Sequence, residues 1–70
     1  MPEMCVAIID ELIEIRKEKG LTQRELAEAA NLAQPAIARL ESKAVTPQLD
    51  TLLKIAAALG YDLALVQITA

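Results

Sequence analysis

The chain lacks most of the residues on which enzymatic chemistry depends. Its 70 residues include no histidine, one cysteine (Cys5) and one serine (Ser42). Nucleophile–base arrangements and the common zinc sites need several such side chains. The two glycines are far apart and form no phosphate-binding loop. We therefore expect no enzyme activity, no cofactor and no metal site.

Aromatic residues are also nearly absent, with one tyrosine and no phenylalanine or tryptophan, although 54% of the chain is hydrophobic. The core must be built from leucine, isoleucine, valine and alanine, which is a helix-rich composition. No apolar run approaches the roughly 18 residues that a membrane span needs, and the N-terminus does not resemble a signal peptide. The lone Cys5 fits a reducing compartment. We expect a cytoplasmic protein without a membrane partner.

Turn and capping signals divide the chain into four expected helices and a tail. Thr22 and Glu25 have the spacing of a capping box, Asn31 tolerates the left-handed conformation of a tight turn, and Gly20 and Gly60 are natural residues to follow a helix. These signals predict one helical domain over residues 1–60, followed by a tail over residues 61–70. The helices are expected at about residues 4–19, 23–30, 34–42 and 48–59.

The tail alternates in the manner of a β-strand from Tyr61 to Ile68, and both of its faces are largely apolar. A single strand cannot satisfy its own backbone groups. The economical solution is pairing with the same strand of a second copy under two-fold symmetry; the alternative is a further helical turn. The residues expected at this dimer contact are Tyr61, Leu63, Leu65, Val66 and Ile68.

The first expected helix has an apolar arc of roughly 180°, which is wider than one packing stripe needs. This arc is therefore a second candidate for the dimer surface. Arg16 lies inside the arc, where a charge needs a partner. Glu41, on the inward side of the third expected helix, is the natural candidate for a structural ion pair.

Residues 21–41 predict two short helices joined by a tight turn, with a polar outer face on the second. This is the layout of a helix-turn-helix, and it points to double-stranded DNA rather than to catalysis. Gln34 can pair with adenine, Pro35 and Ala36 can contact a thymine methyl group, and Arg39 can reach guanine or a phosphate.

Contacts with the DNA backbone are expected to come from the neighbouring helix ends. Gln23 lies at the N-terminus of the second expected helix, where backbone N–H groups and the helix dipole favour a phosphate. Arg24 and Lys43 are further candidates. The full set of expected DNA contacts is Thr22, Gln23, Arg24, Gln34, Pro35, Ala36, Arg39 and Lys43.

The net charge of −3 opposes a DNA-binding function, because affinity for DNA depends largely on lysine and arginine. The acidic residues are unevenly placed: residues 1–20 carry five acidic and three basic side chains, whereas residues 21–45 carry three of each. This balance predicts a weak monomeric binder that depends on dimerisation. An acidic surface elsewhere would suit a basic protein partner.

Over about residues 12–59 the chain resembles the phage Cro/CI repressor-like (XRE-type) helix-turn-helix family. The resemblance implies an all-α, lambda-repressor-like fold of four to five helices, with a recognition helix in the major groove and dimeric binding to a palindromic operator. It also implies that Arg16 pairs with Glu41 and that Gln23 contacts Gln34. The matching residues are Arg16, 20–23, Leu26, Ala27, Ile37, Leu40, Glu41, Pro47 and 52–59.

The tail looks most like those of the HigA and HipB antitoxins. That resemblance implies a nucleoid-associated repressor that is also the antitoxin of a type II toxin–antitoxin pair and binds a basic toxin protein. Two alternatives remain: a phage or chromosomal repressor without a toxin, and a protein-interaction module that has lost DNA binding. The chain departs from the family at Ala33, where Ser or Thr usually caps the recognition helix, a loss of about 1 kcal/mol.

Overall fold

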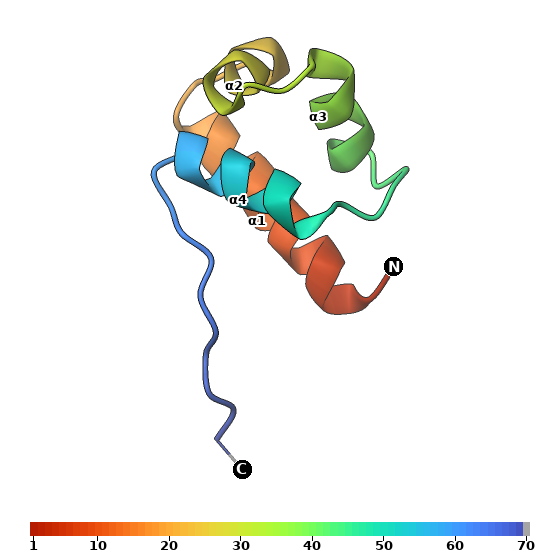
Figure 1. Ribbon diagram of the computed structural model, residues 1–70, viewed down its shortest axis with the longest axis vertical. Coiled ribbons are helices and arrows are strands. Elements are labelled where there is room, and N and C mark those ends of the chain that lie inside the picture. Colours follow the sequence, from red (N-terminus) through yellow and green to blue (C-terminus); the bar gives the residue numbers. More distant parts are fainter. Residues whose placement is uncertain (70) are drawn as a thin grey trace.

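Four helices make up the body of the protein in the computed structural model, which describes residues 1–69. Each helix begins and ends within one residue of the position expected from the sequence, and the predicted all-α, lambda-repressor-like fold is confirmed. The short helices α2 and α3 follow one another through a tight turn and lie together at one end of the molecule (Figure 1). The helices are α1 (Glu3–Glu18), α2 (Gln23–Ala30), α3 (Gln34–Glu41) and α4 (Leu49–Ala58).

All four helices end in the same way, with a residue in the left-handed region that lets the chain reverse direction. Two of these residues are the glycines, and the other two are Asn31 at φ 57° and Lys43 at φ 61°. The amide of the next residue then bonds back to a carbonyl five residues earlier, as Leu32 does to Ala27 at 2.8 Å. This closure satisfies carbonyl groups that the helix end would otherwise leave free.

The core is formed by aliphatic side chains from all four helices. Three of its members are alanines, Ala27, Ala30 and Ala56, whose small size lets α2 lie close to α3 and α4. Each large aliphatic side chain that is fully buried contributes about 1.5–3 kcal/mol. The buried set is Ile9, Leu12, Ile15, Leu26, Ala27, Ala30, Ile37, Leu40, Ile55, Ala56 and Leu59.

The predicted β-strand over Tyr61–Ile68 is not present, and this prediction was wrong for the single chain. Residues 61–69 instead leave the body as an extended segment that is neither helix nor strand (Figure 1). A strand exists only where a neighbour completes its backbone hydrogen bonds, and residues 1–69 of one chain supply none. Ala70, the last residue of the predicted tail, lies outside the described residues.

The tail is mostly exposed despite its apolar composition. Leu63 packs against the core, whereas Leu65, Val66 and Ile68 are 103%, 86% and 89% exposed. Such a run of exposed aliphatic side chains typically marks a contact surface. Among the described residues, no helix has the length and hydrophobicity required to cross a bilayer.

Candidate nucleic-acid interface

Helix α3 divides its side chains between the core and solvent. Ile37 and Leu40 are buried and fix the helix against the body, whereas Gln34, Pro35 and Arg39 are exposed. Ala36, the remaining predicted base contact, is half-buried. The predicted base-reading residues therefore lie along one short helix whose position is set by its buried side.

The start of α3 lacks the side-chain cap that the start of α2 has. Thr22 caps α2: its hydroxyl accepts a hydrogen bond from the Glu25 amide at 3.0 Å, and its amide donates to the Glu25 carboxylate at 2.9 Å. The bond from the Thr22 amide to the carboxylate is the largest cause that lowers the pKa of Glu25. Ala33 at the start of α3 has the extended backbone of a cap, with φ −75° and ψ 140°, but no side-chain bond.

Gln23 and Gln34 lie side by side at the exposed end of the motif. The Gln34 Nε2 group donates to the Oε1 atom of Gln23 at 3.5 Å, a long hydrogen bond between exposed groups. The Gln23 Nε2 group donates in turn to Glu41 Oε1 at 3.0 Å. A chain of hydrogen bonds therefore runs from the end of α3 through α2 to the first residue of α3.

Arg16 and Glu41 meet below this pair of glutamines. Arg16 Nε lies 2.7 Å from Glu41 Oε2, and Arg16 Nη2 donates to Glu41 Oε1 at 2.9 Å. The third arginine nitrogen, Nη1, donates to the Leu21 carbonyl at 2.8 Å. Burial works to raise the pKa of Glu41, but hydrogen bonds from Arg16 and Gln23 outweigh it and hold that pKa below its ordinary value.

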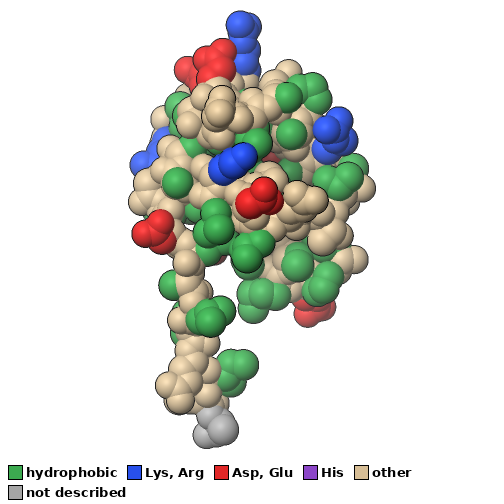
Figure 2. Space-filling model, in the orientation of Figure 1, with side chains coloured by type: hydrophobic (Ala, Val, Ile, Leu, Met, Phe, Trp, Pro, Cys, Tyr) green, Lys and Arg blue, Asp and Glu red, His purple; other side chains and the backbone are tan. Residues whose placement is uncertain are grey.

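The three basic residues predicted to contact DNA differ in whether they already form an ion pair within the protein. Arg24 forms an exposed ion pair with Glu28 at 3.4 Å, and Lys43 Nζ lies 2.5 Å from Asp10 Oδ1 on α1. Arg39 forms no ion pair within residues 1–69. On the face shown in Figure 2, basic and acidic side chains are interspersed rather than gathered into one basic surface. Of these three residues, Arg39 is thus the most available to a ligand.

The Asp10–Lys43 contact was not predicted from the sequence. The two residues are 33 positions apart, and no local pattern connects them. Only the packing of α1 against α3 brings them together. In the free protein the Lys43 ammonium is therefore directed at a carboxylate.

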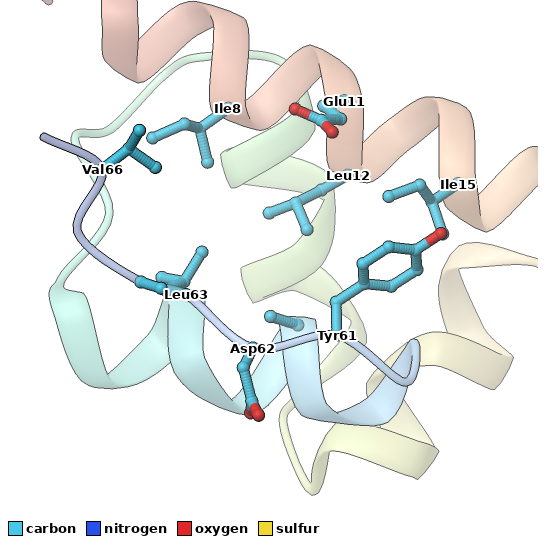
Figure 3. A pocket seen from close by; sticks show the side chains of 10 residues that line it. Ile8, Glu11, Leu12, Ile15, Tyr61, Asp62, Leu63 and Val66 are labelled. Carbon is cyan, nitrogen blue, oxygen red and sulfur yellow. The ribbon is translucent and has the colours of Figure 1, made fainter. Parts of the chain in front are cut away.

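Three of the five residues predicted for the dimer contact, Tyr61, Leu63 and Val66, line a cavity of about 420 Å³ between α1 and the tail. Figure 3 shows Ile8 and Leu12 of α1 facing Leu63 and Val66 of the tail across this space. Tyr61 borders the same cavity, whereas Leu65 lines a second hollow with Leu49 and Leu53 of α4. Ile68 is exposed near the end of the tail. Both hollows are mainly apolar and open to solvent.

Comparison with known proteins identifies the family to which this arrangement belongs. A sequence profile described as helix-turn-helix matches residues 12–66, which is most of the chain. The chain belongs to the helix-turn-helix family. The predicted resemblance to Cro/CI repressor-like (XRE-type) domains is thereby confirmed.

Several relatives of this helix-turn-helix domain are described as regulators. An uncharacterised HTH-type transcriptional regulator of Haemophilus influenzae is 46% identical over 61 residues, covering 87% of this chain and 62% of the relative. The immunity repressor of Bacillus phage phi105 is 48% identical over 48 residues, covering 69% of this chain and 33% of the repressor. The chain therefore spans less than two thirds of the length of these relatives.

A solved structure is similar over almost the whole helix-turn-helix domain. It is described as a toxin–antitoxin module from Streptococcus pneumoniae and is 51% identical, with a TM-score of 0.79. The match covers 96% of this chain and 74% of that one. Within the described residues, no cluster of three His, Cys, Asp or Glu side chains is arranged to hold a metal ion. The relatives from Haemophilus influenzae and phage phi105 are described as a transcriptional regulator and a repressor.

Proposed function

We propose that this domain is a sequence-specific DNA-binding repressor that acts as a dimer and serves as the antitoxin of a type II toxin–antitoxin pair. The observation that carries the proposal is the arrangement of α3, which buries Ile37 and Leu40 and presents Gln34 and Arg39 outward. Membership of the helix-turn-helix family and similarity to a toxin–antitoxin module support it.

Base recognition is assigned to the exposed side of α3. An α-helix fits the major groove, and its N-terminal residues contact base edges. Gln34 there offers an amide for adenine, Pro35 and Ala36 offer apolar contact with a thymine methyl, and Arg39 reaches guanine or a phosphate one turn later.

Contacts with phosphates are assigned to the residues around α3. Thr22 and Gln23 begin α2, where backbone N–H groups and the helix dipole attract an anion. Arg24 has only an exposed ion pair with Glu28 to give up, and such pairs are worth little. Lys43 must exchange Asp10 for a phosphate, so its contribution in the complex is smaller than that of a free lysine.

Dimerisation is assigned to the tail, through Tyr61, Leu63, Leu65, Val66 and Ile68. Two tails that pair under two-fold symmetry would complete each other's backbone hydrogen bonds and cover the exposed aliphatic side chains. The two copies of α3 would then lie about 34 Å apart, one helical turn of DNA, on the same side of the dimer. A dimer doubles the number of DNA contacts and so offsets the unfavourable net charge of −3 on each copy. The apolar face of α1 remains the alternative dimer surface.

The toxin is proposed to be a basic protein, because the domain has a net charge of −3. The protein would act in the cytoplasm, at the nucleoid. A second candidate function, a repressor without a toxin, is favoured by the similarity to a phage immunity repressor. The neighbouring gene distinguishes the two, since a small basic reading frame beside this one supports the antitoxin.

The proposal is tested by selecting duplexes from a random-sequence pool with the wild-type protein and then measuring binding by two variants. Gln34→Ala and Arg39→Ala should each reduce affinity for the selected duplex by about tenfold, since a specific base contact is worth about 1–3 kcal/mol. Lys54→Ala, which removes an exposed cation from α4, is the matched control and should bind as the wild type does. Unchanged affinity and sequence preference in both test variants would refute the assignment of α3 as the reading helix.

A further inference from the structure

We infer that Glu41, which does not itself reach the DNA-facing surface of α3, is a positioning residue that selects adenine over guanine at the base pair read by Gln34. It does so by fixing the orientation of the Gln23 amide, which fixes the orientation of the Gln34 amide. The inference rests on the proposed function and assigns to Glu41 a role beyond its ion pair with Arg16.

The Glu41 carboxylate determines which end of the Gln23 amide faces it. An ionised carboxylate only accepts hydrogen bonds, so Gln23 must turn its Nε2 group toward Glu41, as the 3.0 Å contact shows. A hydrogen bond to a charged acceptor is stronger than one between neutral groups. The Oε1 atom of Gln23 is consequently directed away from Glu41 and toward Gln34.

The Gln23 oxygen then determines the orientation of Gln34. Because Oε1 of Gln23 is only an acceptor, Gln34 must present its Nε2 group, which lies 3.5 Å away. This contact is too long to hold an exposed glutamine alone. The 3.5 Å contact suffices to favour one of the two orientations of the Gln34 amide, which are otherwise similar in energy. In the favoured orientation Gln34 keeps one N–H group and its oxygen free.

The free groups of Gln34 match adenine. In the major groove adenine offers an acceptor at N7 and a donor at N6, which a glutamine amide satisfies with one N–H and its oxygen. If the Gln34 amide were reversed, its oxygen would be occupied and two N–H groups would face the DNA. That arrangement matches guanine, which offers two acceptors at N7 and O6.

Arg16 keeps the Glu41 carboxylate from rotating. It binds both carboxylate oxygens through two nitrogens, and its third nitrogen is held by the Leu21 carbonyl. The side chains of Arg16 and Glu41 are only 11% and 10% exposed, so water does not compete freely for these groups. The orientation imposed on Gln23 is therefore set by a rigid part of the protein.

The test is Glu41→Gln, which replaces a group that only accepts with one that can accept or donate. The probe is the duplex that the wild type selects from a random pool, together with the same duplex carrying guanine for adenine at the position where Gln34→Ala loses its preference. The ratio of the two affinities should fall by about tenfold in Glu41→Gln. Partial unfolding weakens both apparent affinities by the same factor, so the ratio is independent of stability.

Two further variants separate a positioning role from a structural one. Gln23→Met removes the connecting amide and leaves Arg16 and Glu41 in place, and it should lower the ratio as much as Glu41→Gln does. The double variant should lower it no further than either single change. Ile55→Val, a core change remote from these side chains, should keep the wild-type ratio.

A wild-type ratio in Glu41→Gln, or losses that add in the double variant, would overturn the inference and leave the proposed function standing. Failure of the wild type to enrich any duplex would instead overturn the proposed function, and the inference with it.

Discussion

Arg16 of α1 and Glu41 at the end of α3 are 25 residues apart in the sequence and form an ion pair with two contacts, at 2.7 Å and 2.9 Å. The pair connects α1 to α3. Glu41 also accepts a hydrogen bond from Gln23 at the start of α2. One carboxylate of α3 thus holds side chains from both α1 and α2.

Removing one member of this pair should destabilise the domain strongly. We expect Glu41→Ala to lower the free energy of unfolding by about 3 kcal/mol, because Arg16 would be left with an uncompensated charge in a mostly buried place. The double variant Arg16→Met/Glu41→Leu should recover much of that loss, since apolar replacements remove both charges together. Urea denaturation measures both changes. A single variant as stable as the wild type would contradict the structural role of the pair.

Stability should fall in acid, partly because of Glu41. Its pKa is lowered in the folded protein, so its contribution is fully present above the unfolded value of about 4.3 and is lost as the pH falls through the lower folded value. Glu25 acts in the same direction through its bonds with Thr22. The urea midpoint of the wild type should therefore drop as the pH falls below the unfolded value of about 4.3.

Glu41→Gln is the control for this pH dependence, because its side chain does not titrate. It should be less stable than the wild type at neutral pH and lose less stability on acidification. An equal loss in the two proteins would show that other carboxylates govern the acid transition.

A cap restored at the start of α3 should stabilise the domain. Ala33 already has the backbone conformation of a cap, so Ala33→Ser should add about 1 kcal/mol and raise the Tm by about 4–8 °C. Ala29→Ser, at an exposed position inside α2, should lower the stability slightly instead. Thermal unfolding followed by circular dichroism measures the Tm of both variants. No gain in Tm from Ala33→Ser would show that the backbone N–H groups at the start of α3 already have hydrogen-bond partners.

A charge in the tail should change the oligomeric state of the protein. Leu65→Asp and Val66→Asp place a charge on side chains that are 103% and 86% exposed in one chain, so neither should destabilise the monomer. Each should split a dimer in which the tails are paired, and sedimentation should then give the monomer mass. Ala44→Asp, in the loop after α3, carries the same charge as a control. An unchanged dimer in both tail variants would show that the tails do not form the interface, which would then be assigned to another surface, such as the apolar face of α1.

The helices were predictable because their signals are local. Thr22 and Glu25 lie within one turn, and Asn31 occupies the left-handed position that its side chain tolerates. The burial of Arg16 and the choice of Glu41 as its partner both followed from helical periodicity, and the family resemblance agreed with them. The position of Lys43 beside Asp10 could not be predicted, because it depends on the packing of α1 against α3.

The predicted strand failed for a different physical reason. Alternation of side chains along Tyr61–Ile68 describes a segment that is able to pair, but pairing needs a neighbour that the single chain does not provide. The apolar pattern was identified correctly, but in one chain its aliphatic side chains are exposed to solvent and form no sheet.

If this acidic domain binds DNA through α3, its affinity for a duplex should depend strongly on the salt concentration. Fluorescence anisotropy with a labelled duplex selected by the wild type would be measured at about 50 mM and 200 mM salt. A dimer with between two and six phosphate contacts should lose about tenfold to a thousandfold in affinity over that range. Absence of binding even at about 50 mM salt, or an affinity that does not change with salt, would contradict DNA binding through α3. Either result would favour a protein-interaction module that has lost DNA binding.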